Sequence, residues 1–201
     1  MLIKTYETPT YIHPRVNTGI YCTNNDKCYF LSIDLKAANY QVLRMYNLVE
    51  ENTWSGYLAK FIQHPYFSNL KKLRLKILSF ADLYPAKQKI CWQNIMINIL
   101  DAIIKNNIMT ENSFATFNSD EIIFHTTSDQ MGTDKDKCQK FIDKNFYQYQ
   151  TSIEIFQLRL VSPGKPFFVK INQETDKINW KCISAAALPE AIDIWNNTRS
   201  C

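Results

Sequence analysis

Residues 28–43 read CYFLSIDLKAANYQVL, and this stretch decides the fold of the 201-residue chain. Its first half is a short apolar run of β-prone residues that ends at Asp34. From Ala37 onward, apolar side chains recur with near-helical spacing, and neither glycine nor proline interrupts them. The stretch therefore predicts a buried strand, an acidic residue at the end of that strand, and a helix directly after it.

The composition is that of an ordinary globular protein and excludes two classes of nucleotide-binding site. Hydrophobic residues make up 46% and charged residues 21% of a chain whose length suits one domain. Only 4 glycines are present, and neither the Walker nor the dinucleotide-binding glycine spacing occurs. A formal net charge of +4 permits an anionic partner without requiring one.

The cysteines and the apolar runs predict a cytoplasmic or nuclear location. The 6 cysteines are scattered, and the first ten residues, MLIKTYETPT, lack the apolar core of a signal peptide. Reduced thiols are the simpler interpretation. The longest apolar stretch, residues 90–104, is interrupted by polar residues, so we expect no membrane segment and no membrane partner.

The rest of the chain predicts an α+β protein in which strands and helices alternate. Residues 71–80 alternate cations with leucine or isoleucine, a pattern that fits a strand as well as a basic helix. We predict a single domain over residues 1–201. It consists of an N-terminal extension (1–27), a core (28–171) and a C-terminal helical extension (172–201). The other predicted elements are helices at 86–105, 134–147 and 185–195 and strands at 114–117, 122–124, 152–161 and 167–171.

Acidic residues fall at two points that this order brings together. Asp120 and Glu121 lie at the tip of a predicted hairpin, and in a split βαββαβ arrangement that hairpin neighbours the first strand. Phosphoryl transfer uses two cations roughly 4 Å apart, and magnesium prefers oxygen ligands. We therefore predict that Asp34 bridges two Mg²⁺ or Mn²⁺ ions, that Asp120 completes the cluster with support from Glu121, and that the Leu35 carbonyl binds the ion on the triphosphate side.

Two motifs resemble those of palm-domain nucleotide polymerases and nucleotidyltransferases. Ser32–Leu43, SIDLKAANYQVL, is similar to the first palm motif, and it aligns without a gap to the reverse-transcriptase pattern in which D-L-x-x-A leads into Q and an aliphatic residue. Asn118–Phe124, NSDEIIF, resembles the second palm motif. Its Ser-Asp-Glu core is similar to the S-x-D-E-A of translesion polymerases and to the Q-S-D-E of the tRNA-histidine guanylyltransferase family. The latter family has glycine after its first aspartate, where this chain has Leu35.

The resemblance implies a palm-like, ferredoxin-like βαββαβ antiparallel sheet with helices packed on one face. It implies a magnesium-dependent enzyme that adds nucleotides from a nucleoside triphosphate to an RNA or DNA end. Asp34, Asp120 and Glu121 are then the catalytic residues. The candidate substrate-binding residues are Leu35, Lys36, Tyr40, Lys72, Arg74, Lys76, Lys87 and Lys89, of which Lys87 and Lys89 begin a helix and suit the triphosphate, whereas Lys72, Arg74 and Lys76 suit polynucleotide.

Other interpretations stay open. A nucleotide cyclase or signalling-nucleotide synthase shares the palm sheet and its paired carboxylates, and it usually works as a homo-oligomer. A non-catalytic palm-like subunit of a larger polymerase complex, which binds nucleic acid or protein, is favoured by the short segments that flank the motifs: 33 residues before Asp34 and about 80 after Glu121. An Asp-Glu pair at a hairpin tip is also common as a solvated turn, and an aspartate after a strand often caps the next helix.

Overall fold

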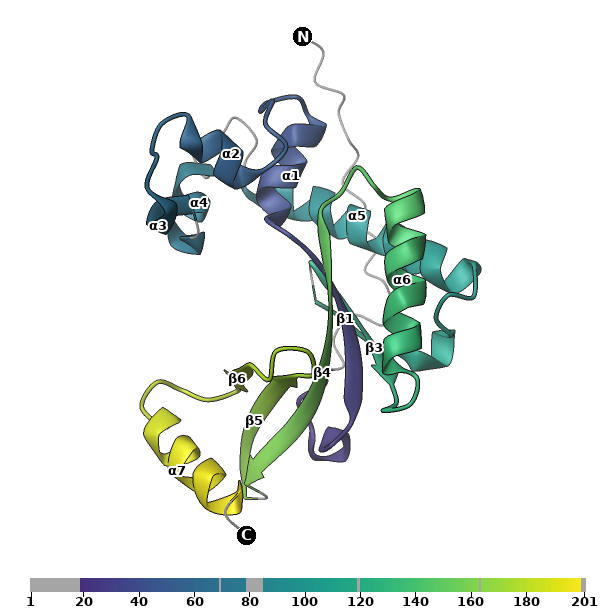
Figure 1. The fold of residues 1–201 in the computed structure, drawn as a ribbon, viewed down its shortest axis with the longest axis vertical. Helices are drawn as coiled ribbons and strands as arrows, with labels where there is room; N and C mark the ends of the chain where they lie inside the picture. Colours follow the sequence, from purple (N-terminus) through teal and green to yellow (C-terminus); the bar gives the residue numbers. More distant parts are fainter. Residues whose placement is uncertain (1–18, 69, 79–84, 119, 163, 200–201) are drawn as a thin grey trace.

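The computed structural model describes residues 19–68, 70–78, 85–118, 120–162 and 164–199, and Figure 1 shows their arrangement. Two short 3-10 turns lie at Thr23–Asn25 and Glu111–Ser113. The strands are β1 (Tyr29–Leu35), β2 (Phe114–Asn118), β3 (Glu121–Thr126), β4 (Thr151–Ser162), β5 (Lys165–Asn172) and β6 (Ile178–Lys181). The helices are α1 (Ala38–Met45), α2 (Trp54–Ala59), α3 (Pro65–Ser68), α4 (Lys71–Leu78), α5 (Pro85–Lys105), α6 (Met131–Asn145) and α7 (Leu188–Arg199).

The strands form one antiparallel sheet in the order β2-β3-β1-β4-β5-β6, which confirms the predicted α+β class. β1 is an inner strand and pairs with β3 on one side and β4 on the other. Its last residues set the register of both ladders, because Asp34 lies opposite Glu121 of β3 and opposite Ser152 of β4. The end of β1 is therefore fixed from both sides.

One face of the sheet carries the main hydrophobic core. Side chains alternate between the two faces of a strand, and Leu31, Ile33 and Leu35 of β1 are buried in the same cluster as Ile99 of α5 and Ile142 of α6. Figure 1 shows α5 and α6 on one side of the sheet. α5 begins at Pro85, whose restricted φ suits the first turn of a helix. The predicted helix at 86–105 is confirmed.

A second, smaller cluster holds α1, α2 and α4 together. Tyr40, Trp54 and Leu58 are buried in it, and Leu73 and Ile77 of α4 pack against it. Residues 71–78 are thus helical, because an i, i+4 pair of apolar side chains reaches this cluster from one side of a helix. Leu75 lies between these two residues in the sequence, so it points to another side of the helix and is 46% exposed.

The C-terminal part contains a strand that the sequence analysis did not predict. β6 lies within residues 172–201, for which we expected a helical extension. Ile178 and Trp180 pair with Ile171 and Val169 of β5, and Trp180 meets Trp195 of α7 edge to face at 6.3 Å. A strand of four residues at a sheet edge leaves too short a pattern to identify from sequence.

None of the helices in the described ranges combines the length and the apolarity that a bilayer crossing needs.

Candidate active site

The second face of the sheet carries the candidate site at the end of β1. Phe30, Ser32 and Asp34 alternate with the core residues of β1 and so project from this face, which we call the site face. Asp34 and Glu121 are direct cross-strand partners, so both side chains stand on the site face with their Cβ atoms about 4.5–5.5 Å apart. The predicted neighbourhood of β1 and the hairpin is confirmed at these two residues.

The tip of the β2–β3 hairpin is tied to the end of β1. Asn118 pairs with Glu121, and the Asp120 N–H donates to the Asn118 carbonyl at 2.6 Å. The Leu35 N–H in turn donates to the Asp120 carbonyl at 3.0 Å. These bonds extend the β1–β3 ladder beyond its last pair, and they place Asp120 beside the residue that follows Asp34.

Burial and mutual repulsion shift the titration of these carboxyl groups. Burial first, and then the charges of Asp120 and Glu121, raise the pKa of Asp34 from 3.8 to about 6, against the opposing charges of Lys170 and Lys71. Burial is also the main cause that raises the pKa of Asp120, opposed by a backbone hydrogen bond and by Lys71. The end of β1 is therefore a place where negative charge is incompletely compensated and where a cation would be favoured.

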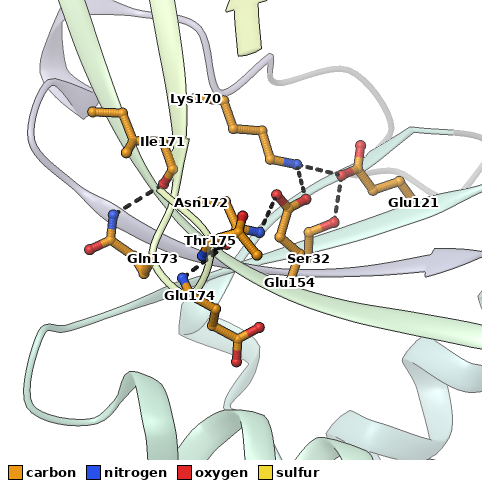
Figure 2. A network of polar contacts seen from close by, with 9 residues as sticks. All are labelled: Ser32, Glu121, Glu154, Lys170, Ile171, Asn172, Gln173, Glu174 and Thr175. Atoms are coloured by element: carbon orange, nitrogen blue, oxygen red, sulfur yellow. Dashed lines mark hydrogen bonds and ion pairs between the residues drawn. The ribbon is translucent and has the colours of Figure 1, made fainter. Parts of the chain in front are cut away.

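A polar network on the site face holds Glu121, and Figure 2 shows its members. The Ser32 hydroxyl donates to Glu121 Oε1 at 2.5 Å, and Lys170 Nζ lies 3.6 Å from the same oxygen. Lys170 Nζ also lies 2.8 Å from Glu154 Oε2, while the Asn172 side-chain amide donates to Glu154 Oε1 at 2.8 Å. Glu121 is thus engaged through one oxygen and Glu154 through both.

The sequence alone did not identify the other four members of this network, which are Ser32, Glu154, Lys170 and Asn172. A usable signal existed, because Ser32 precedes Asp34 by two residues and Lys170 precedes Asn172 by two, so each pair shares a strand face. Polar side chains at alternate positions of otherwise apolar strands indicate a polar site on one face. The missing information was the strand order, which brings β5 beside β4.

Helix α4 supplies two cations to the site, one of them predicted. Burial lowers the pKa of Arg74, which the charge of Asp34 opposes, so Arg74 lies near that carboxyl group. Lys71 acts on both Asp34 and Asp120, although it was not among the predicted substrate-binding residues. Lys72 and Lys76 are exposed and occupy a different side of the helix, at i and i+4. The structure therefore separates Arg74 from the two lysines predicted with it.

The predicted residues just after Asp34 have different surroundings. The Leu35 side chain is buried in the main core, which leaves only its backbone for a metal or a substrate. Lys36 is exposed where β1 ends. Tyr40 is 1% exposed, and its hydroxyl donates to the Glu51 carbonyl at 3.0 Å, so its side chain packs in the second cluster.

The two lysines predicted for the triphosphate lie at the start of α5. Lys87 and Lys89 are both exposed in its first turns. Within the described ranges, the cations that act on Asp34 are Lys170, Lys71 and Arg74. The structure thus brings Asp34, Asp120, Glu121 and Arg74 together, and it does not add Lys87 and Lys89 to the cations around Asp34.

The donor set fits a hard cation only in part. In the described part of the chain, no three histidine, cysteine, aspartate or glutamate side chains form a group ready to hold a metal ion. Asp34 and Asp120 offer carboxylate oxygens in a region of uncompensated negative charge, which suits magnesium. Glu121 is already held by Ser32 and by Lys170. The pair Asp34 and Asp120 is therefore the part of the predicted cluster that fits an ion best.

Comparison with known proteins adds no family to this description. No protein-family model matches the chain, and no curated protein shows a significant match to it. The fold and the site therefore define the protein as a mixed α+β protein with a six-stranded antiparallel sheet and a carboxylate site at the end of a central strand.

Proposed function

We propose that this protein is a magnesium-dependent nucleotide polymerase or nucleotidyltransferase that adds nucleotides to an RNA or DNA end. One observation carries the proposal: the two acidic motifs lie on adjacent central strands, with Asp34 opposite Glu121 and the Asp120 carbonyl bonded to the Leu35 N–H. The raised pKa values of Asp34 and Asp120 point to a site that a divalent cation would stabilise.

The order of the elements supports a palm-like, ferredoxin-like core. Helices connect β1 to β2, a hairpin joins β2 to β3, and α6 connects β3 to β4, which is the βαββαβ succession. The corresponding strands are ordered β2-β3-β1-β4, with the first and third strands side by side at the centre. β5, β6 and α7 are additions beyond β4, at the end of the molecule that holds the C-terminus in Figure 1.

Each group near the site has a role in this chemistry. Bound Mg²⁺ or Mn²⁺ supplies activation of the attacking oxygen and neutralisation of the leaving pyrophosphate. Asp34 and Asp120 would hold the cation, and Glu121 would lie beside them as a third acidic residue. Lys71 and Arg74 lie close enough to these carboxylates to act on them and suit the phosphates of a bound nucleotide. Lys72 and Lys76 face solvent and suit a polynucleotide backbone.

Incubation with labelled nucleoside triphosphates and magnesium, with and without a primer–template, tests the proposal. Primer extension that Asp34→Asn abolishes would support a polymerase, and terminal addition without template would support a nucleotidyltransferase. A cyclic or dinucleotide product would instead identify a cyclase or signalling-nucleotide synthase. The absence of any product with folded protein would contradict the enzymatic proposal.

A non-catalytic nucleic-acid or protein binding subunit is the second candidate, and one contact favours it. Lys170 already pairs with Glu121, so part of the acidic cluster is neutralised without a metal ion. Such a subunit would bind polynucleotide as well after the substitution Asp34→Asn as before it, and as well without magnesium as with it. Fluorescence anisotropy with a labelled oligonucleotide measures this, because a metal-dependent enzyme would lose affinity in both comparisons.

A further inference from the structure

Exposed aromatic side chains gather on one short part of the chain. Among the described residues, eight large hydrophobic side chains are exposed, and four of them fall within residues 61–75. These four are Phe61, Tyr66, Phe67 and Leu75, of which Phe61 is 70% and Tyr66 62% exposed. Apolar groups that are exposed singly need no explanation, whereas a group of them in one place marks an interaction surface.

Ring contacts and backbone bonds join these aromatic residues to helix α4. The Tyr66 and Phe67 rings meet edge to face with their centres 5.4 Å apart. The Leu70 N–H donates to the Phe67 carbonyl at 3.2 Å, and the Arg74 N–H donates to the Leu70 carbonyl at 3.1 Å, so α4 begins within one turn of Phe67. Phe61 precedes Tyr66 by five residues, which keeps their Cα atoms within about 18 Å of each other. In Figure 1, α2, α3 and α4 form one group beside α1.

The exposed side of α4 is basic. Lys72 and Lys76 lie one turn apart on this side together with Leu75, whereas Leu73 and Ile77 pack against the second cluster. Residues 52–81 contain five cations and no acidic residue, so their charge exceeds the net charge of +4 of the whole chain. We call the exposed residues the aromatic–basic surface, which consists of Phe61, Tyr66, Phe67, Lys72, Leu75 and Lys76. This surface is complementary to a negatively charged partner that also has apolar groups.

A single-stranded polynucleotide has both of these properties. Its phosphates attract lysine, and its unpaired bases have faces that stack on aromatic rings. In a duplex the bases stack on one another, so only their edges and the phosphates can be reached. Ordinary protein interfaces are also rich in aromatic residues, but they are depleted of lysine. The combination of exposed rings and lysines therefore favours a single strand over a duplex and over a protein.

We propose that the aromatic–basic surface binds a single-stranded polynucleotide, whose bases stack on Phe61 and Tyr66 and whose phosphates lie against the lysines of α4. The inference goes beyond the proposed function, because a strand would bind here whether or not the carboxylate site is catalytic.

The surface borders the candidate active site. Lys71 is the exposed first residue of α4, and it follows Phe67 by four residues. Its charge opposes the rise in the pKa of both Asp34 and Asp120, so the start of α4 lies near these two carboxyl groups. One part of a strand bound on the surface would therefore lie close to the end of β1.

The experiment measures the affinity of the full chain for two labelled probes by fluorescence anisotropy, in a buffer with magnesium. One probe is an oligothymidylate of about 16 nucleotides, which is long enough to cover the site of a single-strand binding domain, and the other is a blunt duplex of the same length. The main variant is Phe61→Ala with Tyr66→Ala. A second variant, Phe61→Leu with Tyr66→Leu, removes the rings but keeps apolar side chains. Tyr147→Ala is the matched control, because Tyr147 is 81% exposed and lies between α6 and β4.

We expect the two double variants to bind the single strand more weakly. Each contact between a base and a ring is worth at least about fivefold in affinity, so the alanine variant should lose roughly thirtyfold and the leucine variant at least about tenfold. Affinity for the duplex should change by less than about twofold. The slope of log affinity against log salt should stay that of the parent, because the lysines are retained. Tyr147→Ala should bind as the parent does, and the urea midpoints should change little, because the replaced side chains are exposed.

Three results would overturn the inference: unchanged affinity for the single strand in both double variants, an equal loss for the duplex, or an equal loss in Tyr147→Ala. A parent that is dimeric in sedimentation equilibrium, and that the alanine variant converts into a monomer with unchanged strand affinity, would assign the surface to a second copy of the chain. Loss of binding to phosphatidylserine vesicles with unchanged strand affinity would assign it to a membrane. All these results would leave the proposed function standing, whereas a parent that binds the strand through this surface but incorporates no nucleotide would contradict the proposed function alone.

Discussion

Replacing Asp34 with asparagine should stabilise the metal-free protein, because the carboxylate is held in an unfavourable place. Its pKa rises from 3.8 to about 6 on folding, mainly through burial and then through repulsion by Asp120 and Glu121. Each pKa unit corresponds to about 1.36 kcal/mol, so ionised Asp34 costs about 3 kcal/mol of folding free energy at neutral pH. Asparagine removes the charge but must still bury an amide, so we expect a net gain of about 1 to 3 kcal/mol.

The gain should depend on pH with a defined sign. Above pH 6, the carboxyl group is ionised in both the folded and the unfolded chain, and the full cost is present. Between pH 6 and 3.8, the folded chain binds a proton that the unfolded chain does not, so the parent regains stability as the pH falls. At about pH 4.5, the ionisation cost should be about 2 kcal/mol smaller than at neutral pH, so the advantage of Asp34→Asn should fall by that amount.

Urea denaturation of both proteins at about pH 7.5 and about pH 4.5 measures this difference. Asp101→Asn serves as the control, because Asp101 is an exposed aspartate of α5 and the same substitution there should change little at either pH. At the higher pH, magnesium or manganese should raise the melting temperature of the parent and have no effect on Asp34→Asn. Destabilisation by Asp34→Asn, or an equal gain at both pH values, would show that Asp34 is not a strained carboxylate. Equal metal responses would show that it is not a ligand.

Three further predictions concern other parts of the molecule. Gln41→Ala should cost about 2 to 3 kcal/mol in urea denaturation, because the Gln41 side chain makes three hydrogen bonds of 2.6 to 2.8 Å that join the turn after β1 to the start of β4. Lys72→Gln with Lys76→Gln should lower the slope of log affinity against log salt for an oligonucleotide by roughly two, and an unaltered slope would show that neither lysine contacts its phosphates. The Cys138 thiol, which is buried and whose pKa burial raises to about 12, should react with a thiol reagent far more slowly than exposed Cys182, and comparable rates would refute its burial.

The central elements were predictable because their signals are local. β1 is an apolar run with Asp34 as its last residue but one, and the hairpin around Asp120 carries its own turn residues, so both follow from a few neighbouring positions. A βαββαβ arrangement of these elements is then enough to predict that the two motifs are neighbours in the sheet. That part of the candidate site could be predicted from the sequence.

The rest depended on contacts that no local pattern contains. The alternating cations and apolar residues of α4 fit the period of a strand as well as that of a helix. Packing of Leu73 against the second cluster favours the helix. Tyr40 was predicted to bind substrate because it follows Asp34 closely in the sequence. Its side chain instead packs against Trp54 in the second cluster. Lys170 belongs to β5, which two strands separate from β3, so no local pattern of the sequence could predict its contact with Glu121.

The inner position of β1 determines when the site can form during folding. β1 has no partner close to it in the chain: the bond between Ser32 and Glu121 spans 89 residues, and the bond between Gln41, in the helix after β1, and Gln150, just before β4, spans 109. Closing such long loops costs conformational entropy before the stabilising contacts have formed, whereas the β2–β3 hairpin can close early and by itself. During synthesis, β1 must wait with its apolar side chains unpaired until β3 and then β4 have left the ribosome. The acidic residues consequently become neighbours only in a late step, so partly folded chains should lack the carboxylate site.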